Sequence, residues 1–107
     1  MDDDICPTET ALEVIGGKWK GMILYHLLDG TKRFNELRRL MPDITQRMLT
    51  KQLRSLEESG VVHRKVYAEI PPKVEYSLTE IGRELTPIVR GLEKWGAQFL
   101  NVRGTAN

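Results

Sequence analysis

The residues of this chain best suited to chemistry are cations gathered between Lys18 and Arg54. This stretch holds nine lysines and arginines and three acids, a net charge of +6, whereas the whole chain carries +1. The remaining residues therefore sum to −5. A basic middle between acidic ends is typical of a protein that holds a polyanion on one face.

Part of this charge falls on one face of a predicted helix over residues 45–59. Leucines form the apolar edge of its helical wheel: Leu49, Leu53 and Leu56. Cations occupy the opposite face: Arg47, Lys51 and Arg54. Short polar side chains stand near its start: Thr45, Gln46 and Thr50. The alternative to a binding face is an amphipathic helix whose cations are merely solvated.

A helix fits the major groove of B-DNA, where Arg, Gln and Thr side chains can read base edges. We expect Gln46 and Arg47, near the start of the helix, to read bases. We expect Lys51, Arg54 and Arg39 to contact phosphates.

Catalysis and metal binding are not expected. His26 lies in an apolar stretch and His63 in a predicted strand, and neither has a second ligand at metal spacing. The sequence shows no Ser-His-Asp order and no Gly-rich phosphate loop. We therefore expect no enzyme activity, no metal and no cofactor.

The basic face belongs to a helix-turn-helix over residues 33–60. Its first helix, Phe34–Leu40, places Phe34, Leu37 and Leu40 on a predicted buried stripe. Pro42 ends that helix. Thr45 can cap the second helix, and Gly60 can end it in the left-handed conformation.

Two further helices are predicted ahead of the helix-turn-helix. The first starts at Pro7 and ends at Gly16-Gly17. The second, over residues 18–28, is strongly apolar, and we expect its residues at the centre of the core: Trp19, Met22, Ile23 and Leu27.

After Gly60 the pattern changes to β-branched and aromatic residues, in two runs at 61–67 and 73–78. They predict a β-hairpin wing. Arg64 and Lys73 are its candidate contacts to phosphate or the minor groove. The alternative is a hairpin that only covers the core.

The last segment, residues 79–100, opens at a good N-cap, Thr79. Pro87 is expected to kink or divide it. Its apolar stripe, which includes Leu92, Trp95 and Phe99, exceeds what a small core needs and predicts an interface with a second copy. The alternative is that this helix folds back onto its own domain.

These elements predict one domain over residues 1–107, mainly α with a β-hairpin wing (α+β), after an acidic tail at 1–5. No apolar run reaches the length of a membrane span, and the start lacks the features of a signal peptide. The single cysteine, Cys6, fits a reducing compartment. We expect a cytoplasmic protein with no membrane partner.

Five stretches carry a family pattern: Cys6-Pro7, VIGGKWK at 14–20, RFNEL at 33–37, ITQRMLT at 44–50 with QLR at 52–54, and PPKVEYSLT at 71–79. With them the chain resembles the HxlR-type winged helix-turn-helix transcriptional regulators of prokaryotes, from about Cys6 to Gly96. The resemblance implies a homodimer joined through the first and last helices. It also implies two recognition helices in successive major grooves of operator DNA, which repress or activate nearby promoters.

Some members of this family sense electrophiles or oxidants through a cysteine ahead of the first helix, where Cys6 stands. Its place before Pro7 also predicts that Cys6 caps the first helix, where the helix dipole favours a thiolate. The other reading of Cys6 is a small apolar residue packed at a helix start. The alternative to a DNA-binding regulator is a winged-helix module that binds another protein.

Overall fold

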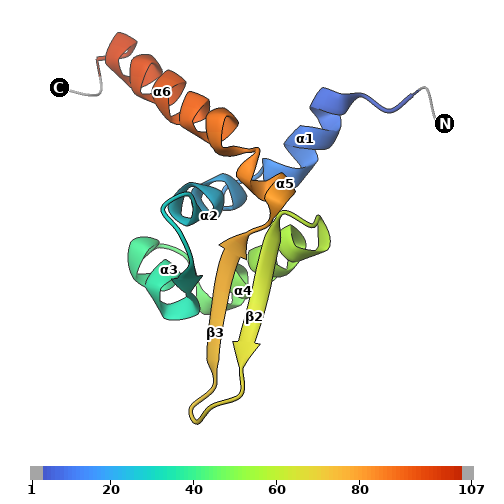
Figure 1. Ribbon diagram of the computed structural model, residues 1–107. Coiled ribbons are helices and arrows are strands. Elements are labelled where there is room, and N and C mark those ends of the chain that lie inside the picture. The colour runs from blue at the N-terminus through green and yellow to red at the C-terminus, as the bar shows by residue number, and fades with distance from the viewer. Residues whose placement is uncertain (1–3, 105–107) are drawn as a thin grey trace.

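The computed structural model describes residues 4–104, and its elements follow the order of a winged helix (Figure 1). They are α1 (Pro7–Ile15), α2 (Lys20–Leu27), β1 (Lys32–Arg33), α3 (Phe34–Leu40), α4 (Gln46–Glu58), β2 (Val62–Tyr67), β3 (Lys73–Leu78), α5 (Glu80–Arg83) and α6 (Thr86–Val102). This α+β architecture is the predicted class. Most of the predicted acidic tail lies outside the described residues.

The helix-turn-helix forms as predicted because the sequence places capping residues at the ends of its helices. The amide of Met48 donates to Thr45 Oγ1 at 3.1 Å, which satisfies one free N–H at the start of α4. Gly60 follows the end of α4 with a φ of 79°, a left-handed conformation that favours glycine. At α3, the Arg33 amide donates to Glu36 Oε1 at 2.8 Å.

The core lies between α2, α3 and the back of α4. The leucines of α4 are buried against α2 and α3: Leu49, Leu53 and Leu56 meet Ile23, Leu24, Leu27 and Leu37. The predicted sidedness of α4 is confirmed. The back of α4 therefore packs directly on α2.

Two residues predicted to be buried, Met22 and Leu40, are exposed, and Trp19 packs against the edge of the core rather than at its centre. Met22 is 43% exposed, and Trp19 is partly buried. Met22 faces an open depression between α2 and α6, and Trp19 precedes α2 with Lys18 above its ring. Leu40 is 46% exposed, because residues three apart drift by about 60° per step around a helix.

The wing is an antiparallel sheet with strand order β1-β3-β2. The predicted hairpin of β2 and β3 is confirmed, with Arg64 opposite Tyr76 and Tyr67 opposite Lys73. The two-residue strand β1 was not predicted, since so short a strand leaves no period in the sequence. It places Arg33 opposite Glu75.

The last segment divides where Pro87 predicted a break. Thr79 accepts the Gly82 amide at 3.1 Å and donates to the Gly60 carbonyl at 2.6 Å, so it starts α5 and ties it to the end of the helix-turn-helix. A Cβ at Gly82 would clash with the carbonyl oxygen of Val61, so only glycine lets α5 approach the residue before β2 this closely. The segment then turns into α6.

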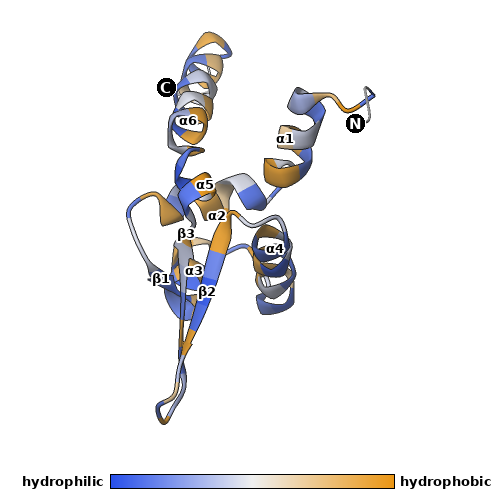
Figure 2. Ribbon diagram, turned by 45° about the vertical axis from the view of Figure 1, so that its right-hand side comes forward, coloured by the Kyte–Doolittle hydropathy of each residue, from blue (hydrophilic) through white to orange (hydrophobic). Residues whose placement is uncertain are grey.

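Two helices project from the body at the end opposite the wing (Figure 1). In α6 only Val89 is buried, and α1 has no buried residue. Both contain exposed apolar residues, and hydrophobic segments are orange on both helices in Figure 2. None of the helices in residues 4–104 combines the length and hydropathy needed to cross a bilayer.

Candidate nucleic-acid interface

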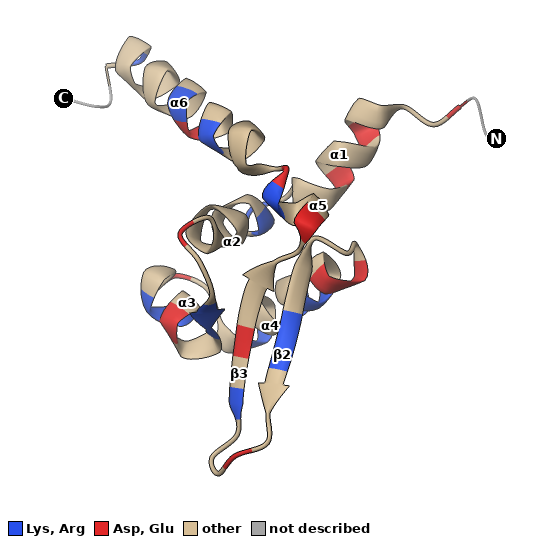
Figure 3. Ribbon diagram, viewed as in Figure 1, with Lys and Arg blue, Asp and Glu red and all other residues tan. Residues whose placement is uncertain are grey.

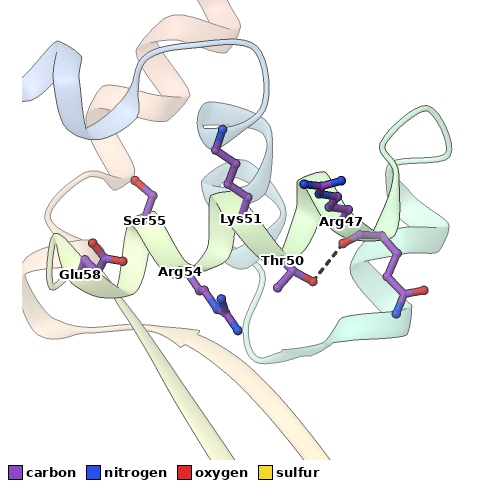
Figure 4. Close-up of a pocket in the computed structure, with 7 residues that line it drawn as sticks. Arg47, Thr50, Lys51, Arg54, Ser55 and Glu58 are labelled. Atoms are coloured by element: carbon purple, nitrogen blue, oxygen red, sulfur yellow. Dashed lines mark hydrogen bonds between the residues drawn. The ribbon is translucent and has the colours of Figure 1, made fainter.

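The outer face of α4 is an open surface of unpaired cations. Arg47, Lys51 and Arg54 are exposed, and within residues 4–104 none of them forms an ion pair or a side-chain hydrogen bond. They line a shallow depression of about 790 Å³ with Gln46 and Thr50. Figure 4 shows Arg47 and Lys51 on one side of the helix and Arg54 on the other. These cations can therefore bind a polyanion without first breaking an ion pair within the protein.

The two threonines of α4 are already engaged. Thr45 Oγ1 accepts the Met48 amide, so its O–H remains free to donate, as a phosphate requires. Thr50 donates its O–H to the Gln46 carbonyl at 2.9 Å, so only its lone pairs remain. Thr45 can therefore still donate a hydrogen bond, and Thr50 can still accept one.

A groove of about 460 Å³ separates α4 from the wing. Arg54 of α4 and Arg64 of β2 both line it, and the floor includes Tyr76. The structure therefore brings these two predicted contacts together. Glu57 also lines this groove. The fold thus brings one carboxylate into the same groove as the two arginines.

Lys73 does not share that groove. The alternation of β3 puts it on the other face of the wing, with its Nζ 4.3 Å from the centre of the Tyr67 ring and 4.0 Å from Glu75. The Tyr67 hydroxyl donates to Glu75 at 2.8 Å, and Lys65 also lies over the ring, at 4.8 Å. This cluster stiffens the wing.

Arg39 stands apart from α4. It is exposed on α3 and lines a small polar depression together with Arg38, which the sequence reasoning left out. Figure 3 shows Lys and Arg on α3, α4 and β2, together with acidic residues on α3, α4 and β3, and acidic residues on α1 and α5. We call the exposed cations of α3, α4 and β2 the basic surface.

Cys6 is exposed and is the N-cap of α1, as its place in the sequence predicted. Its sulfur makes no full capping hydrogen bond, but the amides of Glu9 and Thr8 at the open helix end lower the pKa of the Cys6 thiol below its usual value. This favours the reactive thiolate.

Across residues 4–104 no group of three His, Cys, Asp or Glu residues could hold a metal ion.

The predicted dimer residues lie on α6, away from the basic surface. Leu92, Trp95 and Phe99 are exposed, and the rings of Trp95 and Phe99 stack with their centroids 5.1 Å apart.

His26 lies on α2. Burial and the positive charge of Lys32 lower its pKa, and together they outweigh the negative charge of Asp29, which raises it.

Comparisons with known proteins agree with this geometry. Residues 14–103 match the HxlR-like helix-turn-helix family model. The chain is 62% identical over 98 residues to YdeP of Bacillus subtilis (strain 168), an uncharacterised HTH-type transcriptional regulator, covering 92% of this chain and 77% of YdeP.

The fold of this chain also matches that of the redox regulator HypR. The reduced form matches with a TM-score of 0.89 at 60% identity, over 94% of this chain and 99% of HypR. The oxidised form matches with a TM-score of 0.83 at 64% identity, over 87% and 96%. A family match over most of the chain, close relatives and an open basic recognition helix lead to one conclusion: the protein belongs to the HxlR family of winged helix-turn-helix transcriptional regulators.

Proposed function

We propose that this protein binds operator DNA sequence-specifically, with α4 in the major groove, and so regulates transcription. The observation that carries the proposal is the outer face of α4, where three unpaired cations stand beside Gln46 on a helix whose back is locked into the core. A rigid helix with free donors can read base edges. Arg47 and Gln46 are the proposed base readers, and Lys51 is a proposed phosphate contact.

The groove between α4 and the wing suits one DNA strand. When a recognition helix enters the major groove and a wing reaches the adjacent minor groove, the backbone between the grooves passes between the two elements. Arg54 and Arg64 stand on either side of that path. In this arrangement both contact phosphate, and Arg39 of α3 and Lys73 contact phosphates at the edges of the interface.

The proposed regulator is a homodimer joined through α1 and α6. Both helices leave the body with apolar side chains in solvent, among them Leu12, Leu92, Trp95 and Phe99. Exposed apolar area of this extent marks an interaction surface. A two-fold dimer would present two recognition helices to two half-sites. The role needs no cofactor and no catalytic group, and its place is the cytoplasm, where operator DNA lies.

Titration of DNA from upstream of the protein's own gene tests the proposal. Fluorescence anisotropy should show binding at least about 10³-fold tighter than to a shuffled duplex of the same composition. The logarithm of the affinity should fall linearly with the logarithm of salt concentration. Equal affinity for both duplexes, or no binding to either, would favour the alternative, a winged-helix module that binds protein.

We also propose that Cys6 makes the regulator responsive to oxidants or electrophiles. Its thiol is exposed, its pKa is lowered, and HypR is known in reduced and oxidised forms. With one cysteine in the sequence, a disulfide must join two subunits or capture a small thiol. Diamide should reduce operator binding and change non-reducing gel mobility in the wild type but not in Cys6→Ser. A structural Cys6 would leave the two proteins alike.

A further inference from the structure

Four polar side chains connect α6 to α2, two from each segment. The Tyr25 hydroxyl of α2 donates to Glu93 Oε2 of α6 at 2.9 Å. Asp29, just after α2, lies 3.8 Å from the Arg90 guanidinium of α6. Arg90 also pairs with Glu93 at 3.4 Å and covers the Tyr25 ring at 5.6 Å, so Tyr25, Glu93 and Arg90 contact one another in turn and Asp29 is attached through Arg90. We call these four residues the α2–α6 clamp.

Apolar packing does little to fix α6 at this place. Val89 is its one buried residue, and from Arg90 to Gly104 every described residue is exposed except the half-buried Gly96. An open depression of about 420 Å³ lies between α2 and α6, lined by Met22, Leu92 and the clamp residues Tyr25 and Glu93. Because the space between the helices is not filled, polar contacts set the tilt of α6.

The clamp contacts have the geometry needed for that role. Tyr25 and Asp29 are one turn apart along α2, and Arg90 and Glu93 are nearly one turn apart on α6. Two attachment points resist both rotation of α6 about its axis and a swing away from α2. Each exposed ion pair alone is weak. The Tyr25–Glu93 hydrogen bond is charge-assisted and is the shortest contact of the four. The Glu93 carboxylate, through this bond and its charge, also raises the pKa of Tyr25.

A small tilt at the clamp becomes a large displacement at the interface. Nine residues separate Glu93 from Val102, about 13 Å of helix. A tilt of about 10° would move that end by about 2 Å. Since α2 carries α4 on its other side, a change of tilt changes how far apart two recognition helices stand in a dimer.

We propose that the α2–α6 clamp fixes the distance between the recognition helices and thereby selects the spacing of the two half-sites, with Tyr25 and Glu93 as positioning residues. This inference rests on the proposed dimeric DNA-binding function. DNA readers of this kind bind half-sites about one helical turn, or a multiple of it, apart. A loose clamp admits neighbouring spacings, and a firm one excludes them.

The test compares Tyr25→Phe with a matched control, Tyr67→Phe. Each loses a hydroxyl bonded to a glutamate, but Tyr67 is in the wing, where its partner is Glu75. The probes are duplexes with two copies of the half-site selected from a randomised pool, spaced in steps of one base pair, and a duplex with a single half-site.

Tyr25→Phe should flatten the spacing profile. Affinity at the best spacing should fall by about three- to tenfold, and affinity at neighbouring spacings and for the single half-site should stay within about twofold. Tyr67→Phe should scale all spacings alike. Glu93→Gln, whose amide oxygen still accepts the Tyr25 hydroxyl, should retain more of the preference than Glu93→Ala. A wild-type profile in Tyr25→Phe, or equal flattening in Tyr67→Phe, would overturn the proposal.

A measurement without DNA separates this inference from the proposed function. A spin label on Ser59→Cys in a Cys6→Ser background reports the distance between the two recognition helices of the free dimer. Tyr25→Phe should broaden that distance distribution relative to the clamped protein, and an unchanged distribution would refute the clamp. A narrow distribution in a protein that does not prefer its selected site would refute the proposed function while supporting the clamp. A protein that remains monomeric would overturn both.

Discussion

At the scale of single residues, the proposed binding mode assigns base reading to Arg47 and charge neutralisation to Lys51. Arg47 stands in the first turn, where a helix inserted in the major groove meets base edges. Lys51 lies one turn further along the same side (Figure 4). Arg carries a planar fork suited to guanine, whereas Lys acts as a point charge.

Arg47→Ala should therefore weaken binding to the selected site by about 1–3 kcal/mol and relax the preference at one base position. Lys51→Ala should weaken binding to all sequences alike and reduce the salt slope by about 1. Anisotropy titrations over single-base variants of the site measure both effects. Unchanged affinity in the double variant would exclude α4 as the recognition element.

His26 adds a pH dependence to stability. Its pKa is held below the ordinary value of about 6.5, so the unfolded chain takes up the proton more readily than the folded protein. The stability contributed by the neutral imidazole is complete above that ordinary value and is lost as the pH falls towards and through the lowered pKa.

Urea unfolding at pH 7.5 and 5.5 should show that His26→Gln loses less stability on acidification than the wild type. His63→Gln, at an exposed position in β2, serves as the control and should behave like the wild type. Equal losses in wild type and His26→Gln would contradict this assignment.

At this scale the sequence predicted local features well. The Thr45 cap, the left-handed Gly60 and the opposed leucine and cation faces of α4 depend only on neighbours within a few residues. Met22 was assigned to the core because it lies in an apolar stretch, and Leu40 because of its spacing from Phe34 and Leu37. The exposure of Met22 depends on how α6 lies against the body, which no local pattern contains, and that of Leu40 follows from the drift of this spacing around the helix.

At the scale of elements, the wing and α4 act as a pair. Their groove collects Arg54, Arg64 and Glu57 from two elements, and the sequence predicted only the two arginines as contacts. The sequence could not place Glu57 in this groove, because that placement depends on the path of the hairpin back along α4. The Tyr25–Glu93 bond was missed for the same reason, since 68 residues separate its partners.

The position of Glu57 yields a gain-of-affinity prediction. Its carboxylate faces the proposed path of the backbone, so Glu57→Gln should strengthen DNA binding by about threefold at moderate salt, and less at high salt. Glu84→Gln is the matched control: it removes the same charge from an exposed residue at the end of α5, outside both this groove and the depression on the outer face of α4. If both variants gain equally, total charge rather than the groove explains the effect.

At the scale of the whole molecule, the two ends of the structure differ in charge and in apolar exposure. The basic surface occupies the end with the wing, and α1 and α6 project at the other (Figures 1 and 3). The sequence predicted the apolar excess of the last helix, and the structure shows it unpaired within one chain. In the proposed dimer, the surface of the second copy that covers these apolar residues of α6 is set by tertiary geometry, which the sequence pattern does not contain.

Trp95→Ala tests this division. Aromatic anchors at the centre of an interface typically contribute 2 kcal/mol or more, so dimer affinity should fall by at least about 30-fold and operator binding should fall with it. Sedimentation velocity and anisotropy on the same samples measure the two losses. Ile81→Ala, an equally exposed apolar residue on α5, should leave the dimer intact. A wild-type monomer at micromolar concentration would contradict the proposed interface.

The central claim, a dimer that reads the major groove twice through α4, is tested most directly by footprinting the wild-type protein on its selected site. Hydroxyl-radical cleavage and guanine N7 methylation interference should show two symmetric patches on one face of the duplex, with centres about 10 base pairs or a multiple of it apart. Methylation should interfere inside both patches. A single patch, or protection that N7 methylation does not disturb, would contradict the account.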